Sequence, residues 1–123
     1  MNDIRVAVIL PAYNESLTIV GAILDFAKVL PEAKIIIIDN NSNIGRFVTI
    51  SCASNITIGK KCLISYNVTI LDHDHNFKEL DIFTSGITKG AQIVIDDGCF
   101  IGAHSFILKG VHLGKNCVVG SGS

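Results

Sequence analysis

Aliphatic residues recur at every sixth position through most of the chain from residue 38 onward. The spacing slips by two residues once, is interrupted by an irregular segment, and then resumes. Neither an amphipathic helix, with a period of 3.6, nor an alternating strand, with a period of two, produces a six-residue repeat. The repeat predicts a three-sided solenoid in which each hexad forms one short strand and one corner. The series consists of Ile38, Ile44, Ile50, Ile58, Ile64, Ile70, Ile95, Ile101, Ile107, Leu113 and Val119.

Small residues accompany these hexads. A small or apolar residue recurs four places after the aliphatic one, and Cys62, Cys99 and Cys117 hold this place. We expect these thiols to point into the solenoid as small hydrophobic groups, because the chain has no CxxC pair that would indicate a zinc or redox site. Cys52 lies outside this register and receives no role. Glycine directly follows the aliphatic residue at Gly45, Gly59, Gly102, Gly114 and Gly120.

The first forty residues follow a different pattern. A β-branched apolar run ends at Pro11, residues 14–30 place apolar side chains at helical spacing, and a second apolar run covers residues 34–39. This order predicts a β-α-β unit. The predicted domains are therefore residues 1–42, the β-α-β unit, and residues 43–123, a solenoid interrupted by a loop at residues 71–92.

Composition narrows the function classes. The chain has 10 Lys and Arg against 11 Asp and Glu, with no basic run, so a nucleic-acid partner is not expected. No segment reaches the roughly 20 consecutive apolar residues that span a bilayer, and the first residues lack the features of a signal peptide. We expect a soluble cytoplasmic protein with no membrane partner.

The segments "ITIGKKCLISYNVTILDHDHNF" and "IDDGCFIGAHSFILKGVHLGKNCVVGSGS" resemble the hexapeptide-repeat acetyltransferases of the maltose and galactoside O-acetyltransferase type. The resemblance covers about residues 41–123. It implies a mainly β fold, a left-handed parallel β-helix, assembled as a homotrimer. It also implies acetyl-CoA as a substrate, no metal, and a small-molecule or saccharide acceptor.

The resemblance implies a catalytic histidine near the start of the loop that interrupts the coils. Counting five residues from Ile70 gives His75, with His73 as the alternative. An imidazole suits this role because acyl transfer needs a base for the proton of the attacking hydroxyl. Two other interpretations of "DHDH" stay open: a polar loop tip, and a metal site formed by His73, Asp74 and His75. His73 and His75 would share one face of an extended segment, but the rest of the sequence supplies no obvious third ligand.

The resemblance also implies where the coenzyme binds. The predicted binding residues are Phe100, Gly102, Ala103 and Ser121, and Phe100 stands where many relatives have tryptophan. The amide of Ala103 is the predicted donor to the oxyanion of the tetrahedral intermediate.

The first 42 residues resemble the opening β-α-β unit of inverting glycosyltransferases with the GT-A fold, in "VAVILPAYNES" and "IIIIDNNS". By that resemblance Tyr13, Asn14, Glu15 and Asp39 would contact a nucleotide. The Asp-x-Asp metal motif and the acceptor half are absent from the sequence, so a structural appendage is the favoured interpretation.

The sequence therefore predicts an acetyl-CoA-dependent O-acetyltransferase acting on a sugar or polysaccharide hydroxyl, with His75 as general base. The alternative hypothesis is a catalytically incomplete chimera, natural or engineered, with a structural role only. Nucleotide-sugar binding through the N-terminal segment is a third hypothesis.

Overall fold

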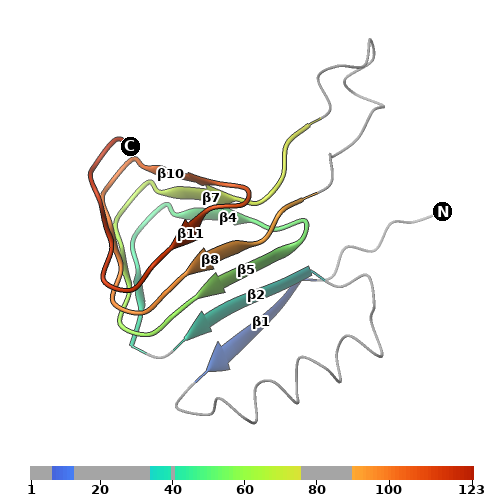
Figure 1. Cartoon of the computed structure of the whole chain (residues 1–123), viewed down its shortest axis with the longest axis horizontal. Coiled ribbons are helices and arrows are strands. Elements are labelled where there is room, and N and C mark those ends of the chain that lie inside the picture. The colour runs from blue at the N-terminus through green and yellow to red at the C-terminus, as the bar shows by residue number, and fades with distance from the viewer. Residues whose placement is uncertain (1–6, 13–33, 40, 76–89) are drawn as a thin grey trace, which may run out of the picture.

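All regular structure in the part of the chain that the computed structural model describes, residues 7–12, 34–39, 41–75 and 90–123, is β-strand (Figure 1). The predicted helix at residues 14–30 lies outside these residues, so the β-α-β prediction stays a prediction. The strands are β1 (Ala7–Ala12), β2 (Lys34–Asp39), β3 (Asn43–Ile44), β4 (Thr49–Ser51), β5 (Asn55–Ile58), β6 (Leu63–Ile64), β7 (Thr69–Leu71), β8 (Ile93–Ile95), β9 (Phe100–Ile101), β10 (Phe106–Leu108), β11 (His112–Leu113) and β12 (Val118–Val119).

Successive strands from β2 onward enter three different sheets in turn. The sheets have the orders β1-β2-β5-β8-β11, β3-β6-β9-β12 and β4-β7-β10, and every pairing is parallel. In Figure 1 the strands β2, β5, β8 and β11 lie side by side along one wall of the coil, and β4, β7 and β10 along another. The three sheets and their parallel pairing confirm the predicted three-sided solenoid. The left-handedness of the coil stays a prediction.

The strand register explains the slip in the hexad spacing. Ile95 pairs with Leu113, eighteen positions later, which is the length of three hexads. Ile38 pairs with Ile58, twenty positions later. The two additional residues fall between β4 and β5, so the backbone at this corner bulges beyond an ordinary turn of the solenoid.

The interior is a stack of isoleucine side chains. Ile58, Ile64 and Ile70 are fully buried, and their partners in the next turn, Ile95, Ile101 and Ile107, are buried as well. Cys62 and Cys99 are buried in the same core, and Cys117 packs against it, which confirms the predicted inward position of these thiols. Burial raises the pKa of the Cys99 thiol.

The recurring glycines let neighbouring turns approach each other. A Cβ atom on Gly45 would lie 2.7 Å from the carbonyl carbon of Ser65, and one on Gly102 would lie 2.5 Å from the backbone nitrogen of Ser121. Contacts of this length exclude a side chain, so glycine at this place is a requirement of close coil stacking.

The corners need left-handed backbone. Asn67, with φ of 55°, and Gly122, with φ of 74°, hold equivalent corners of two turns, and both residue types tolerate this conformation. Phe47 holds the same corner of the first turn with φ of 58°, although a residue of this size pays about 1–2 kcal/mol for it.

The two N-terminal strands extend one wall of the solenoid. β2 pairs with β5 on one side and with β1 on the other. β1 is the edge strand of that sheet, which suits Pro11 because proline has no N-H to donate. Asp39 ends β2, whereas Tyr13, Asn14 and Glu15 lie outside the described residues. The described residues contain no helix of a length and hydrophobicity that would cross a bilayer.

Candidate active site

The chain leaves the solenoid and returns to it at one point, next to Asp72. The Asp72 amide donates to the carbonyl of Ser51 at 3.3 Å, and the Asp72 carbonyl accepts from the amide of Ala91 at 2.9 Å. A Cβ atom on Gly90 would lie 2.9 Å from Cβ of Ser54, so the returning strand passes close to the previous turn. Asp72 therefore joins both ends of the loop to the coil beneath.

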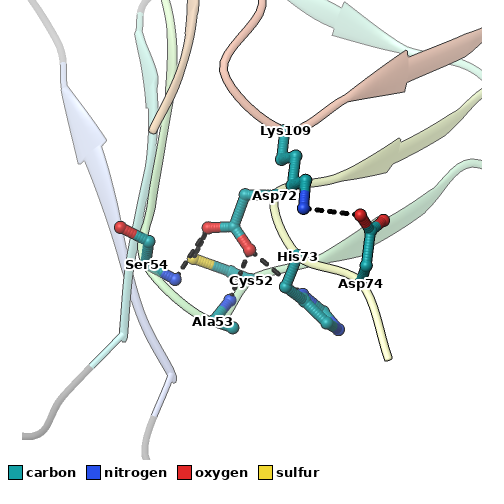
Figure 2. Close-up of polar contacts among 7 residues, drawn as sticks. All are labelled: Cys52, Ala53, Ser54, Asp72, His73, Asp74 and Lys109. Atoms are coloured by element: carbon teal, nitrogen blue, oxygen red, sulfur yellow. Dashed lines mark hydrogen bonds and ion pairs between the residues drawn. The ribbon is translucent and has the colours of Figure 1, made fainter. Parts of the chain in front are cut away.

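The carboxylate of Asp72 is fully buried and holds the enlarged corner described above. It accepts hydrogen bonds from the backbone amides of Ala53 at 2.6 Å and Ser54 at 2.7 Å, and from the thiol of Cys52 at 3.5 Å (Figure 2). Burial alone would raise the pKa of Asp72, but the two amides, together with His73 and Cys52, hold this pKa below its usual range. Asp72 is therefore an ionised carboxylate whose hydrogen bonds come from the chain.

His73 is oriented by this carboxylate. Its Nδ1 atom lies 3.1 Å from Oδ1 of Asp72, and the residue is 8% exposed. An ionised carboxylate only accepts hydrogen bonds, so Nδ1 carries the hydrogen in this contact, and Nε2 has the lone pair whenever the ring is neutral. A carboxylate in this position fixes the tautomer and the orientation of the imidazole that it contacts.

His75 lies beside His73 and is exposed. The two ring centroids are 6.5 Å apart, with an edge-on angle of 73°. Asp74, between them in sequence, forms an ion pair with Lys109, which follows β10 (Figure 2). Within residues 7–12, 34–39, 41–75 and 90–123 no three His, Cys, Asp or Glu side chains are grouped so that they would hold a metal ion.

The predicted coenzyme residues lie together at another corner. Phe100 begins β9 and is 38% exposed, Gly102 and Ala103 follow β9 and are buried, and Ser121 is exposed one turn further along. The Ala103 carbonyl accepts from the amide of Gly122 at 2.9 Å. The Ala103 N-H donates to no group in the described part of the chain.

The structure separates the two predicted groups within one chain. His73 and His75 follow β7, at the corner that leads from the β4-β7-β10 sheet, whereas Gly102 and Ala103 follow β9, at the corner that leads into that sheet. One wall of the solenoid lies between them.

Sequence reasoning missed Asp72 and Cys52, to which it gave no role. The signal was present as an aspartate directly after a hexad strand, combined with a two-residue slip one turn earlier. The slip adds backbone N-H groups that no neighbouring strand pairs, and a buried carboxylate satisfies them.

Comparison with known proteins supports the repeat. Residues 92–123 match the family described as hexapeptide repeat of succinyl-transferase. The chain carries hexapeptide repeats. It also matches proteins named as acetyltransferases: YvoF of Bacillus subtilis (strain 168), 35% identical over 68 residues, and the galactoside O-acetyltransferase of Lactococcus lactis subsp. lactis (strain IL1403), 31% identical over 70 residues. A third relative, the bifunctional protein GlmU of Ruthia magnifica subsp. Calyptogena magnifica, is 34% identical over 92 residues.

The match to YvoF covers 55% of this chain and 35% of YvoF. The match to the galactoside O-acetyltransferase covers 57% of this chain and 33% of that protein. The match to GlmU covers 75% of this chain and 17% of GlmU, so the chain spans about a third or less of each relative. No solved structure gives a significant match. None of the three names refers to a glycosyltransferase, so the resemblance predicted for residues 1–42 stays a prediction.

Proposed function

We propose that this protein transfers an acetyl group from acetyl-CoA to a hydroxyl group of a sugar or polysaccharide. The observation that carries the proposal is the buried Asp72 carboxylate, which holds His73 in one tautomer beside an exposed His75 where the solenoid is interrupted. The named acetyltransferases among the relatives support acyl transfer, and one of them is named for a galactoside acceptor.

In this proposal His75 is the general base. Its exposed imidazole accepts the proton of the acceptor hydroxyl while the hydroxyl oxygen attacks the carbonyl carbon of the thioester. His75 then returns the proton to the sulfur as the carbon–sulfur bond breaks, which leaves an O-acetyl sugar and free coenzyme A. His73 and Asp72 hold the segment that carries His75, so they are positioning residues.

The residues at the other corner fit the coenzyme. Acetyl-CoA supplies the activated acyl group as a thioester. The N-H of Ala103, without a partner in the described residues, is a donor suited to the oxyanion of the tetrahedral intermediate. The partly exposed ring of Phe100 offers an apolar surface on the strand that leads to Ala103. Ser121 is exposed at the same corner of the next turn. No metal is required in this proposal.

The separation of the two corners within one chain implies an active site shared between copies. We propose a homotrimer, in which His75 of one subunit faces the Ala103 corner of its neighbour. This places the base and the oxyanion donor on different chains, so neither corner would be active alone.

The experiment compares the wild-type protein with His75→Ala and His73→Ala. Release of free thiol from acetyl-CoA, with a range of sugars as acceptors, is followed spectroscopically. Loss of a general base lowers kcat by about 10²–10⁴-fold, so His75→Ala should lie in this range. Removal of His73, a positioning residue, should cost less and should shift the pH profile.

Calorimetric binding of acetyl-CoA is the matched control. Both variants should still bind the coenzyme, because the proposed binding residues Phe100, Gly102, Ala103 and Ser121 are unchanged in them. Absence of coenzyme binding by the wild-type protein at millimolar concentration would remove the proposal, and full activity of His75→Ala would remove the role of His75.

A further inference from the structure

A pocket of about 610 Å³ lies where β3 and β6 end, at a corner of the first two turns. Its lining includes Arg46, Phe47 and Tyr66, with polar side chains from Asn43, Ser65 and Asn67. None of the residues assigned to acyl transfer lines it. It lies on the same column of corners as Gly102 and Ala103, because β3, β6 and β9 belong to one sheet, but its own lining residues have no assigned role.

Phe47 is unfavourable in two ways where it stands. It has a left-handed backbone, with φ of 58°, at a corner where the next turn has Asn67. Its ring is 81% exposed, so no burial inside the chain offsets the strain. Stability of the solenoid does not explain a phenylalanine here, whereas a ligand that covers the ring does.

Tyr66 supplies a second ring to the same pocket. The residue is 52% exposed, and its ring meets the ring of His104 edge-on, with centroids 5.1 Å apart. His104 belongs to the next turn, so the contact restrains the tyrosine from one side and leaves the remaining ring surface toward solvent. Two aromatic rings thus border the pocket on successive turns.

Arg46 is the positively charged residue of the pocket lining. It is exposed, and its guanidinium forms no ion pair or hydrogen bond with any side chain in the described part of the chain. An arginine with five free N-H donors at a pocket rim pairs best with a carboxylate or phosphate, which it contacts in a bidentate manner.

We propose that this pocket binds a sugar ring that carries an anionic group. The apolar C-H face of a sugar suits the exposed rings of Phe47 and Tyr66, and its hydroxyls suit the amides of Asn43 and Asn67. An aryl acid would leave those amides without partners, which is unfavourable in a binding site. Arg46 selects the anionic group. A role of this ligand as acyl acceptor rests on the proposed function, but its binding does not.

The test is a titration of the ¹⁵N-labelled protein without coenzyme, using D-glucuronate, D-glucose 6-phosphate and neutral D-glucose. The two anionic sugars should shift the amide signals of Gly45, Ser65 and Asn67, and D-glucose should bind about tenfold more weakly or worse. A carboxylate preference over phosphate, or the reverse, identifies the kind of anion. Arg46→Gln should remove the difference between the anionic and neutral sugars.

Phe47→Asn separates binding from stability. Asparagine tolerates the left-handed backbone, so this variant should melt about 2–5 °C higher than the wild-type protein while it loses sugar binding. Asn67→Ala, at the equivalent corner of the next turn, is the matched control and should lower the melting temperature.

Four outcomes would overturn the proposal. Equal binding of the neutral and anionic sugars, or no binding of any of them, contradicts it directly. A lower melting temperature for Phe47→Asn identifies Phe47 as a packing residue. A change of oligomeric state in that variant, with sugar binding retained, identifies the patch as an interface between copies of the chain. Binding without acetyl transfer would instead sustain this inference and count against the proposed function.

Discussion

Asp72 shows how much one residue contributes to this solenoid. Its backbone joins the two ends of the loop, and its carboxylate satisfies two amides that the enlarged corner leaves without strand partners. The same carboxylate orients His73 and, after the effect of burial, helps raise the pKa of the Cys52 thiol to about 12. One side chain thus supports both the stability of the corner and the geometry of the candidate site.

Replacing Asp72 should therefore destabilise the protein strongly. Asp72→Ala leaves the part-buried amides of Ala53 and Ser54 without acceptors, at about 1–3 kcal/mol for each group. The free energy of unfolding, measured by urea denaturation at neutral pH, should fall by about 2–5 kcal/mol. Asp74→Ala is the matched control, because Asp74 forms a half-exposed ion pair with Lys109, and such pairs contribute about 0–1 kcal/mol. Equal effects of the two substitutions would contradict the role of Asp72.

The depressed pKa of Asp72 gives this effect a pH dependence. A carboxyl group whose pKa is lower in the folded state contributes its full stabilisation above its unfolded pKa, about 4. The contribution is lost as the pH falls through the lower folded pKa. The stability difference between wild type and Asp72→Ala, followed by denaturation from pH 7 to pH 2.5, should be constant above about pH 5 and shrink below pH 4. A difference that grows in acid would contradict the assignment.

At the scale of elements, the strands are too short to be stable alone and depend on stacking between turns. β9 and β12 have two residues each, and they pair through Phe100 with Val118 and Ile101 with Val119. Gly102 follows directly, and the backbone of the next turn lies only 2.5 Å from the position of a Cβ atom there. The stability of these short strands therefore depends most on the distance between neighbouring turns.

Gly102→Ala should separate the third and fourth turns. The new Cβ atom would lie 2.5 Å from the nitrogen of Ser121, so the backbone must shift, and overpacking of this kind costs about 1–3 kcal/mol. Gly114→Ala is the matched control, since nothing lies within 4 Å of its Cβ position, and it should be neutral or slightly stabilising. The stability of the two variants is measured by thermal unfolding and by hydrogen exchange of the Val119 amide. A Gly102→Ala protein as stable as Gly114→Ala would show that the turns are not in close contact.

At the scale of the whole molecule, the outer walls carry large apolar side chains. Leu63, Phe100 and Val118 stand in register on one wall and are 45%, 38% and 73% exposed, and Phe106 and Leu108 are exposed on another. Apolar surface in such an array marks an interaction site more often than it remains in water. It agrees with an assembly in which neighbouring chains cover these walls.

We expect sedimentation equilibrium to give three times the mass of one chain. Val118→Asp, which puts a charge on the most exposed of the three registered side chains, should shift the equilibrium toward smaller species and reduce acetyl transfer in parallel. A stable wild-type monomer would contradict both the trimer and the shared active site, whereas an active Val118→Asp monomer would contradict only the second.

The histidine segment shows where sequence reasoning reached its limit. Counting along the hexads identified His73 and His75 and the loop that carries them, because the repeat period is local. It gave no role to Asp72, because the amides that this carboxylate binds belong to the previous turn, about twenty residues earlier. One chain places Phe100, Gly102 and Ala103 at another corner than His75, and an active site shared between neighbouring subunits stays a prediction.

The sequence by itself determined the solenoid. A six-residue period buries an aliphatic side chain at each corner only if the chain winds in three-sided turns, and the glycines and inward cysteines follow from that winding. Only the tertiary structure decided which groups come together across turns: Asp72 with the amides of the enlarged corner, and Arg46 and Phe47 with Tyr66 around one pocket. The reason is physical, since these contacts join residues of successive turns, and their geometry depends on how many residues each turn contains.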